Sequence, residues 1–281
     1  MRSAQVYIFG AHGFIGANLS RLLSDLKIQH FRVVRKTAMS LSTGEIYSDD
    51  LTLEQALSEI PILNQPCLII NCIGLTKFDG DNCFKEMMES NFEIPSQIVK
   101  SIEKIPTANI VHLSTELVND TSPSNREQYK LTKKLGDDKI SCLGSIRHKI
   151  VHLPLILSTN NKSSSLVSEL KRMEADSHVP EIINPNFVIN FCTLTEISRF
   201  LISIVSNFLS RGEIPSVIDL TTHRLTIKEL FEIRKWILKY PNKNRDFIIR
   251  QILEINTENF THFQKYNVDE MNQVLTALAD I

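Results

Sequence analysis

The sequence predicts an α/β protein built on a doubly wound parallel sheet. Three observations support this prediction: short runs that are apolar throughout, helix-like stretches between them, and a glycine cluster directly after the first run. Strands that are covered on both faces read as continuous apolar runs, and helices between such strands indicate right-handed crossovers in a parallel sheet. We expect a smaller, mainly helical lobe after the sheet domain.

Apolar runs and the stretches between them give the elements of the first half of the chain. We expect strands at residues 6–9, 31–34, 68–70, 110–113 and 150–157, with a further strand just before Asp50. We expect helices at residues 53–60, 93–102 and 127–135, and a first helix that carries Ile15, Leu19, Leu22, Leu23 and Leu26 on one face. This alternation is the basis of the fold prediction.

The pattern changes after Leu157. Residues 158–165 are polar and typical of a loop. Beyond them we expect helices at residues 166–173, 195–208 and 226–240, with brief strands at residues 187–191 and 217–220. We therefore expect a sheet domain at residues 1–157 and a smaller lobe at residues 158–281, packed on the first, and leave open that the chain crosses between the two.

Composition excludes several functional classes. The chain has 281 residues, of which 42% are hydrophobic and 22% charged, as in ordinary globular proteins. Its net charge of −1 gives no basic excess for nucleic acid. No apolar run approaches the roughly 18 residues of a membrane helix, and residues 6–9 are too short for a secretory signal. Five cysteines without zinc-like spacing predict no metal site and favour a reducing, cytoplasmic location.

The glycine cluster is the first functional signal. Gly10, Gly13 and Gly16 lie between the first predicted strand and the first predicted helix. Glycine at this place allows a tight turn, a close approach to a pyrophosphate, and close helix–strand packing, while the helix N-terminus attracts phosphate. The alternative is an ordinary glycine-rich turn. The context favours a dinucleotide-binding Rossmann fold.

Charges at the end of the second strand indicate which dinucleotide is bound. Many such folds carry an acid there, which binds the ribose 2′-hydroxyl. This chain instead has Arg35 and Lys36, with Arg32 just before them, and no acid between Asp25 and Glu45. The cations suit a 2′-phosphate, so we prefer NADP(H) and leave NAD(H) open. Alternatively, these are solvated charges beyond the sheet edge.

A tyrosine–lysine pair is the second functional signal. Tyr129 and Lys133 are four residues apart, so a helix presents both on one face. A nearby ammonium lowers the pKa of a phenol, which suits proton exchange with a carbonyl or an alcohol. Ser114 and Thr115 end the strand at residues 110–113, where a hydroxyl can bind the same substrate oxygen. Taken singly, the pair could be an exposed helix face and the hydroxyls a turn or helix cap.

These segments together resemble the extended short-chain dehydrogenase/reductases, the NAD-dependent epimerase/dehydratase superfamily, which act mostly on nucleotide-linked sugars. Residues 10–16 resemble the Gly-x-x-Gly-x-x-Gly fingerprint, and residues 113–118 resemble the strand end that bears the catalytic Ser or Thr, here Thr115. Tyr129 and Lys133 are similar to the Tyr-x-x-x-Lys pair. The motifs occur in order over about 155 residues.

The resemblance also implies further cofactor contacts. They are His12, Phe14 and Ile15 in the glycine loop, Asp50 and Leu51 at the adenine, Cys72, Ile73 and Gly74 after the fourth strand, Asn91 in the helix before the catalytic strand, and Pro154 at the nicotinamide amide. In the implied mechanism, hydride passes between nicotinamide and a sugar carbon while Tyr129 gives or takes a proton. Lys133 would hold the nicotinamide ribose and keep Tyr129 acidic, and Thr115 would fix the substrate oxygen.

Departures from the family pattern narrow the expected reaction. Sugar dehydratases of this superfamily carry Asp-Glu after the catalytic Thr, but this chain has Glu116 and Leu117. The pattern Ser-Thr-x-x-Val at residues 114–118 is closer to 4-keto-sugar reductases of the dTDP-4-dehydrorhamnose reductase group. We therefore expect NADPH-dependent reduction of a nucleotide-linked 4-keto sugar for surface polysaccharide, in a protein that could pair as a homodimer. An epimerase and a non-catalytic NADP-sensing protein are the alternatives.

Overall fold

The computed structural model describes most of the chain. The described residues are 4–34, 48–62, 65–76, 82–121, 126–144, 147–158, 165–175, 184–214, 220, 222–241, 244–245, 248–249 and 266–279. Arg35 and Lys36 lie outside them. The chain divides into two compact units, Met1–Leu153 with Ile197–Leu220, and Pro154–Glu196 with Thr221–Ile281. We describe each unit by itself.

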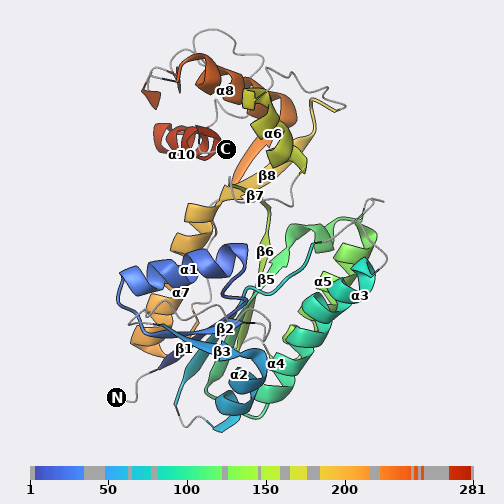
Figure 1. Ribbon diagram of the computed structural model, residues 1–281, viewed down its shortest axis with the longest axis vertical. Helices are drawn as coiled ribbons and strands as arrows, with labels where there is room; N and C mark the ends of the chain where they lie inside the picture. The colour runs from blue at the N-terminus through green and yellow to red at the C-terminus, as the bar shows by residue number, and fades with distance from the viewer. Residues whose placement is uncertain are drawn as a thin grey trace. The chain divides into compact units, whose positions relative to one another are not determined.

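A parallel sheet forms the centre of the first unit (Figure 1). Its described strands are β1 (Gln5–Phe9), β2 (His30–Val34), β3 (Ser48–Thr52), β4 (Cys67–Asn71), β5 (Ala108–Thr115) and β6 (His148–Leu153). They are ordered β3-β2-β1-β4-β5-β6, and every neighbouring pair is parallel. The order reverses between β1 and β4, which is where doubly wound folds bind ligands. The predicted fold class is confirmed.

Helices cover both faces of this sheet (Figure 1). One face carries α1 (Phe14–Asp25) and α7 (Leu194–Arg211), and the other carries α2 (Leu53–Glu59), α4 (Ile94–Ile102) and α5 (Glu127–Ser141). Shorter turns complete the connections: η2 (Ile60–Ile62), α3 (Cys83–Met88), the π-helical turn η3 (Glu89–Glu93) and the 3₁₀ turn η4 (Glu116–Asn119). Tyr7, Phe9, Ile69, Ile98 and Ile110 belong to the apolar core of this unit.

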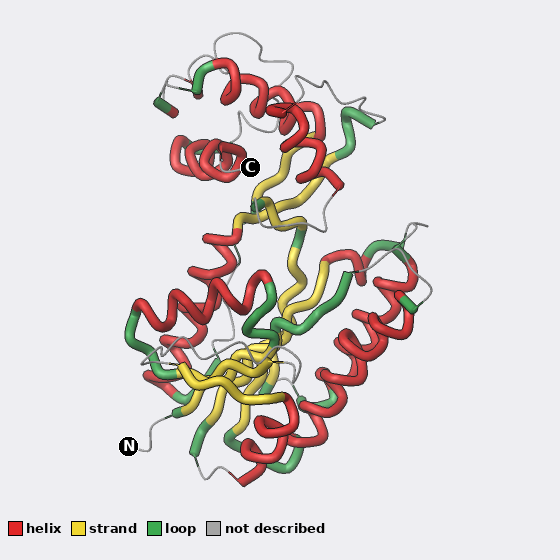
Figure 2. Tube along the Cα trace, viewed as in Figure 1, coloured by secondary structure: helices red, strands yellow, loops and turns green. Residues whose placement is uncertain are grey.

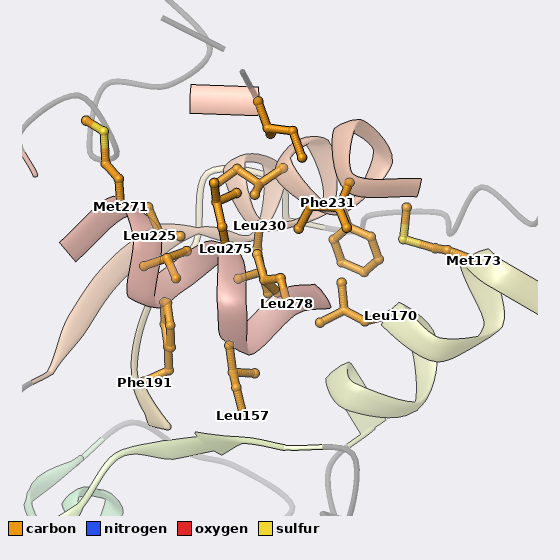
Figure 3. Close-up of a cluster of buried hydrophobic side chains, with 14 of the residues drawn as sticks. Leu157, Leu170, Met173, Phe191, Leu225, Leu230, Phe231, Met271, Leu275 and Leu278 are labelled. Atoms are coloured by element: carbon orange, nitrogen blue, oxygen red, sulfur yellow. The ribbon is translucent and has the colours of Figure 1, made fainter. Parts of the chain in front are cut away.

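The second unit is a small sheet with helices (Figure 2). Its strands β7 (Leu155–Leu157), β8 (Val188–Thr193) and β9 (His223–Thr226) are ordered β7-β8-β9, with β7 parallel and β9 antiparallel to β8. The helices are α6 (Ser165–Ala175), α8 (Ile227–Lys239) and α10 (Val268–Ala279). Figure 3 shows their shared core, in which Leu157, Leu170, Phe191, Leu230 and Leu275 are buried.

Local sequence signals explain where two helices begin. Thr52 precedes α2, and its hydroxyl accepts a hydrogen bond from Gln55 N while the Gln55 side chain accepts one from Thr52 N. Thr226 and Glu229 form the same reciprocal pair at the start of α8. Such capping boxes satisfy backbone donors that a helix N-terminus otherwise leaves unpaired.

Several boundaries differ from the predicted ones. The run at residues 150–157 is two strands of different sheets, because Pro154 has no N–H to donate to a ladder and separates β6 from β7. Asp50 and Leu51 lie within β3 rather than after it, and α5 continues to Ser141. The predicted strand at residues 217–220 falls, apart from Leu220, outside the described residues. No helix in the described part of the chain is both long and apolar enough to cross a bilayer.

Candidate active site

The glycine loop joins β1 to α1 with unusually close backbone contacts. Gly10 has a φ of +78°, and a Cβ there would meet Ile73 Cγ1 at 3.0 Å. A Cβ on Gly16 would lie 2.3 Å from Gly10 O, so the first turn of α1 can sit against the loop only because Gly16 has no side chain. Gly13 is the N-cap residue of α1 and forms no side-chain cap. The loop therefore brings backbone, rather than side chains, to the start of α1.

The other predicted residues of this loop surround the helix start. His12 is exposed, and Phe14 and Ile15 are partly exposed in the first turn of α1. Backbone N–H groups in the first turn of a helix have no partner within the helix, and the helix dipole makes this end attractive to phosphate. Because Gly10 and Gly16 carry no Cβ, the loop packs closely against Cys72 and Ile73 and against the first turn of α1, which is the tight strand-to-helix turn that a dinucleotide-binding fold requires. The residues present thus fit a dinucleotide pyrophosphate.

The segment after β4 is held beside the glycine loop. Cys72 N donates to Phe9 O at 2.9 Å, and Ile73 N donates to the side-chain oxygen of Asn71 at 3.1 Å. The side chain of Asn91, fully buried in η3, accepts from Leu75 N at 2.9 Å and donates to Leu75 O at 3.0 Å. The side-chain amide of Asn91 therefore fixes the backbone of this segment, because it pairs with the N–H and the C=O of Leu75 as a neighbouring strand would.

A second close approach places α5 against the same asparagine. Asn91 Nδ2 donates to Thr132 Oγ1 of α5 at 3.0 Å. Gly136, one turn further along α5, lies so near η3 that a Cβ would be 2.2 Å from Asn91 O. Asn91 is thus the common contact of the segment after β4 and of α5, the helix that carries Tyr129 and Lys133.

Tyr129 meets two hydroxyl groups. Its phenol forms hydrogen bonds with the side chains of Thr115, at the end of β5, and Thr76, after β4. Burial raises the pKa of Tyr129, while these hydrogen bonds and the charge of Arg126 act in the opposite direction. The expected lowering of the Tyr129 pKa by a neighbouring ammonium is therefore wrong for this structure, because burial has the larger effect.

Lys133 lies next to Tyr129 on the buried face of α5. It is 3% exposed, and its ammonium donates to Leu113 O at 2.8 Å. A Cβ on Gly74 would lie 3.4 Å from the Lys133 nitrogen, so the segment after β4 passes directly over the amine. Burial lowers the pKa of Lys133 to about 8, opposed by the charges of Asp137 and Cys72.

Three further predicted cofactor contacts lie in β3 and directly after β6. Asp50 forms an ion pair with Arg32 across β2 and β3, with Asp50 Oδ1 2.5 Å from Arg32 Nε. Leu51 packs against the apolar core of the first unit. Pro154 is buried and directly follows the last residue of β6.

Two residues near the site, Thr76 and Asp137, were not predicted from the sequence. Thr76 lies in a segment without periodic pattern, so only its place after a predicted strand could have pointed to it. Asp137 follows Tyr129 and Lys133 at the same spacing of four residues, so the helical period alone could have placed it on their face. No group of three or more His, Cys, Asp or Glu side chains within the described part of the chain could hold a metal ion.

Comparison with known proteins agrees with this geometry. The model of the NAD dependent epimerase/dehydratase family matches residues 6–139. No curated protein matches the chain by sequence at a significant level.

Solved structures share the fold over nearly the whole chain. The Bordetella bronchiseptica enzyme WbmG, in complex with NAD and UDP, has a TM-score of 0.67 at 15% identity, covering 98% of this chain and 92% of its own. The UDP-glucuronic acid 4-epimerase from Bacillus cereus, in complex with NAD, has a TM-score of 0.66 at 14% identity, covering 98% and 96%. The NDP-hexosamine 5,6-dehydratase TunA has a TM-score of 0.63 at 16% identity, covering 95% and 100%.

Proposed function

We propose that the chain is a member of the NAD dependent epimerase/dehydratase family, whose model matches residues 6–139, and that it reduces a nucleotide-linked 4-keto sugar with NADPH. It is an enzyme of the extended short-chain dehydrogenase/reductase class, which uses a nicotinamide cofactor. The observation that carries the proposal is the phenol of Tyr129, hydrogen-bonded with Thr115 at the carboxyl end of β5 and one helical turn from Lys133. This is the arrangement of a proton donor beside a substrate oxygen.

The protonation states favour reduction. Reduction of a ketone requires a proton donor at the carbonyl oxygen. The raised pKa of Tyr129 keeps its phenol protonated at neutral pH, and Thr115 offers a second hydroxyl to the same oxygen. Lys133, with a pKa of about 8, is mainly an ammonium at neutral pH and so provides positive charge one helical turn from Tyr129. Transfer of the Tyr129 proton then leaves a phenolate that this charge stabilises.

A bound nicotinamide dinucleotide would supply the hydride for this reduction. The glycine loop would hold its pyrophosphate, and Cys72, Ile73 and Gly74, after β4, would line its other half. Arg35 and Lys36 support NADP(H) over NAD(H), on the chemistry of a 2′-phosphate alone. Titration with each dinucleotide by calorimetry, in the wild type and in an Arg35→Ser, Lys36→Ser double variant, tests the preference. Equal loss of both affinities in the variant would contradict it.

An epimerase is the second candidate. A hydroxyl that gives a proton in one direction takes it back in the other, so Tyr129 and Thr115 would also serve a cycle of oxidation and re-reduction. The similar fold of the Bacillus cereus UDP-glucuronic acid 4-epimerase favours this alternative. Dehydration is less favoured despite the similar fold of TunA, because Leu117 follows Glu116 where a second acid would be needed.

Incubation with NADPH and a panel of UDP- and dTDP-linked 4-keto sugars distinguishes these functions. A reductase oxidises one NADPH per sugar, whereas an epimerase interconverts UDP-sugars without net change in cofactor. Tyr129→Phe removes the proposed proton donor, and Tyr240→Phe in the second unit is the matched control. Tyr240→Phe should behave as the wild type. A Tyr129→Phe variant with full turnover would overturn both functions. The resulting nucleotide-linked sugar, with a hydroxyl at C4, would serve surface-polysaccharide synthesis in the cytoplasm.

A further inference from the structure

Asp137 continues the line of Tyr129 and Lys133 along the buried face of α5. It follows Lys133 by one helical turn and is 7% exposed. Its Oδ2 atom accepts a hydrogen bond from Ser114 Oγ at 2.8 Å and lies 3.1 Å from His152 Nε2. Ser114 and His152 are paired neighbours on β5 and β6. One carboxylate of α5 therefore holds the ends of two adjacent strands.

The other carboxylate oxygen of Asp137, Oδ1, faces His112. The hydrogen bonds around His112 determine which ring nitrogen carries its proton. Asn71 Oδ1 accepts from Ile73 N at 3.1 Å, so the Asn71 amide nitrogen is the atom 2.8 Å from His112 Nδ1 and donates to it. The proton of the neutral imidazole is then on His112 Nε2, which is 3.5 Å from Asp137 Oδ1. A chain of polar groups thus links the segment after β4 to Asp137.

Asp137 is the anion of this buried cluster. Burial alone would raise the pKa of Asp137, but the nearby imidazole of His112 and the hydrogen bonds with His152 and Ser114 outweigh burial and hold the pKa below its usual range. Burial likewise lowers the pKa of His112, to about 4, so this imidazole is neutral at neutral pH and adds no positive charge. The cluster therefore carries negative charge below the catalytic helix face.

A neighbouring negative charge stabilises the buried ammonium of Lys133. Its ammonium is buried, and its hydrogen bond to Leu113 O involves a neutral acceptor. The ionisable groups that act on it are Asp137 from α5, Cys72 from the segment after β4, and His112 from β5. Burial raises the pKa of the Cys72 thiol to about 12, and His112 is neutral, so neither offsets the lysine charge at neutral pH. Of these three side chains, Asp137 is therefore the one that carries a negative charge at neutral pH.

We propose that Asp137 is a positioning residue that keeps Lys133 in its ammonium form and, through Ser114, holds the strand end that carries Thr115 in place. Asp137 acts through Lys133 and touches no reacting atom. The consequence for turnover rests on the proposed function, but the electrostatic effect on Lys133 does not. The effect is a property of the free protein and is measured there.

Titration of Lys133 by NMR in the cofactor-free protein tests the proposal. The Lys133 signal in a ¹³C-lysine-labelled sample is assigned by its loss in Lys133→Met. Asp137→Asn should lower the Lys133 pKa by about one unit or more, the effect of removing one nearby opposite charge. Asp137→Glu, which keeps the charge, should retain most of the wild-type value. Asp138→Asn makes the same change at an exposed position of the same helix and should leave Lys133 unaffected.

A second measurement needs no variant and so does not depend on whether Asp137→Asn folds. In the wild-type protein, the ¹³C shift of the Asp137 carboxylate should show a step at the pH where Lys133 loses its proton. A flat Asp137 signal through that range, or equal Lys133 midpoints in Asp137→Asn and Asp138→Asn, would overturn the proposal. Neither readout uses substrate or cofactor. A protein without reductase or epimerase activity could still show the coupling, so the two failures are distinguishable.

Discussion

At the scale of single residues, burial decides the acid–base properties of the site. The pKa values of Tyr129 and Lys133 shift in opposite directions for one reason, because exclusion of water disfavours the charged form of each side chain. The hydrogen bonds from Thr76 and Thr115 limit the shift of the phenol. The two threonines therefore adjust how readily Tyr129 gives up its proton.

Thr76→Val should weaken proton donation by Tyr129. Loss of this hydrogen bond raises the pKa of Tyr129 further, so the alkaline limb of the kcat profile should move to higher pH. We expect kcat at neutral pH to fall about fivefold to tenfold, the equivalent of one hydrogen bond of about 1 kcal/mol. Thr76→Ser keeps the hydroxyl and should restore both values. A Thr76→Val profile that coincides with the wild-type profile would contradict the role of Thr76.

Sequence reasoning proposed Thr115, Tyr129 and Lys133 as site residues because strand ends and helical spacing are visible in one dimension. It gave the wrong direction for the Tyr129 pKa because it counted a neighbouring charge and could not count burial. Thr76 was missed because it comes together with Tyr129 only when β4 and β5 pair.

At the scale of elements, the approach of α5 to η3 sets the geometry of the site. The π-helical turn at Glu89–Glu93 contains Asn91, and Gly136 allows the helix to reach it. The side chain of Asn91 then joins Leu75 to Thr132. Functional segments of several elements are thereby tied to one buried amide.

Gly136→Ala should destabilise the first unit. The added methyl would lie 2.2 Å from Asn91 O, a backbone atom that cannot move without shifting η3. Overpacking of this kind costs about 1–3 kcal/mol, although alanine is the better helix former by about 1 kcal/mol. We expect lower protection of β4 and β5 amides in native-state hydrogen exchange. Lys134→Ala, at an exposed position of α5, should leave the protection unchanged. Equal protection in both variants would contradict the close contact.

Element prediction succeeded where periodicity is long and failed where it is short. The helix at Glu127 was found, but not its end at Ser141, because the last turn carries few apolar residues. The split of the run at residues 150–157 depends on Pro154 and on two separate sheets, which an apolar run does not reveal. The π-helical turn has no signal in spacing, since one extra residue per turn is set by tertiary contacts.

At the scale of the whole molecule, parallel strands joined by crossover helices follow from the alternation of strands and helices, which is why the doubly wound sheet was predictable. The grouping of Ile197–Leu220 with the sheet of the first unit was not predictable, because the local sequence of α7 does not indicate which sheet the helix packs against. The boundary at residues 157 and 158 stays a prediction.

Stability of the first unit should fall on acidification through His112. Its pKa is about 4 in the folded protein and 6.5 in the unfolded chain, so between these values the unfolded chain binds more protons. The free energy of unfolding should therefore decrease as the pH is lowered across this window, by up to about 1.4 kcal/mol per pH unit for one proton. Asp137, with a lowered pKa, adds a further loss at still lower pH. Hydrogen exchange of β5 amides measures the slope. His112→Gln should remove it, and an unchanged slope would contradict the assignment.

The central claim is that Tyr129 delivers a proton to a substrate oxygen held beside Thr115 and Lys133. The most direct test compares wild type and Tyr129→Phe in turnover of a nucleotide-linked 4-keto sugar, with dinucleotide affinity measured in parallel by calorimetry. We predict a loss of about 10²–10⁴-fold in kcat, as for removal of a general acid, with cofactor affinity nearly unchanged. A Tyr129→Phe enzyme that turns over as fast as the wild type would contradict the account.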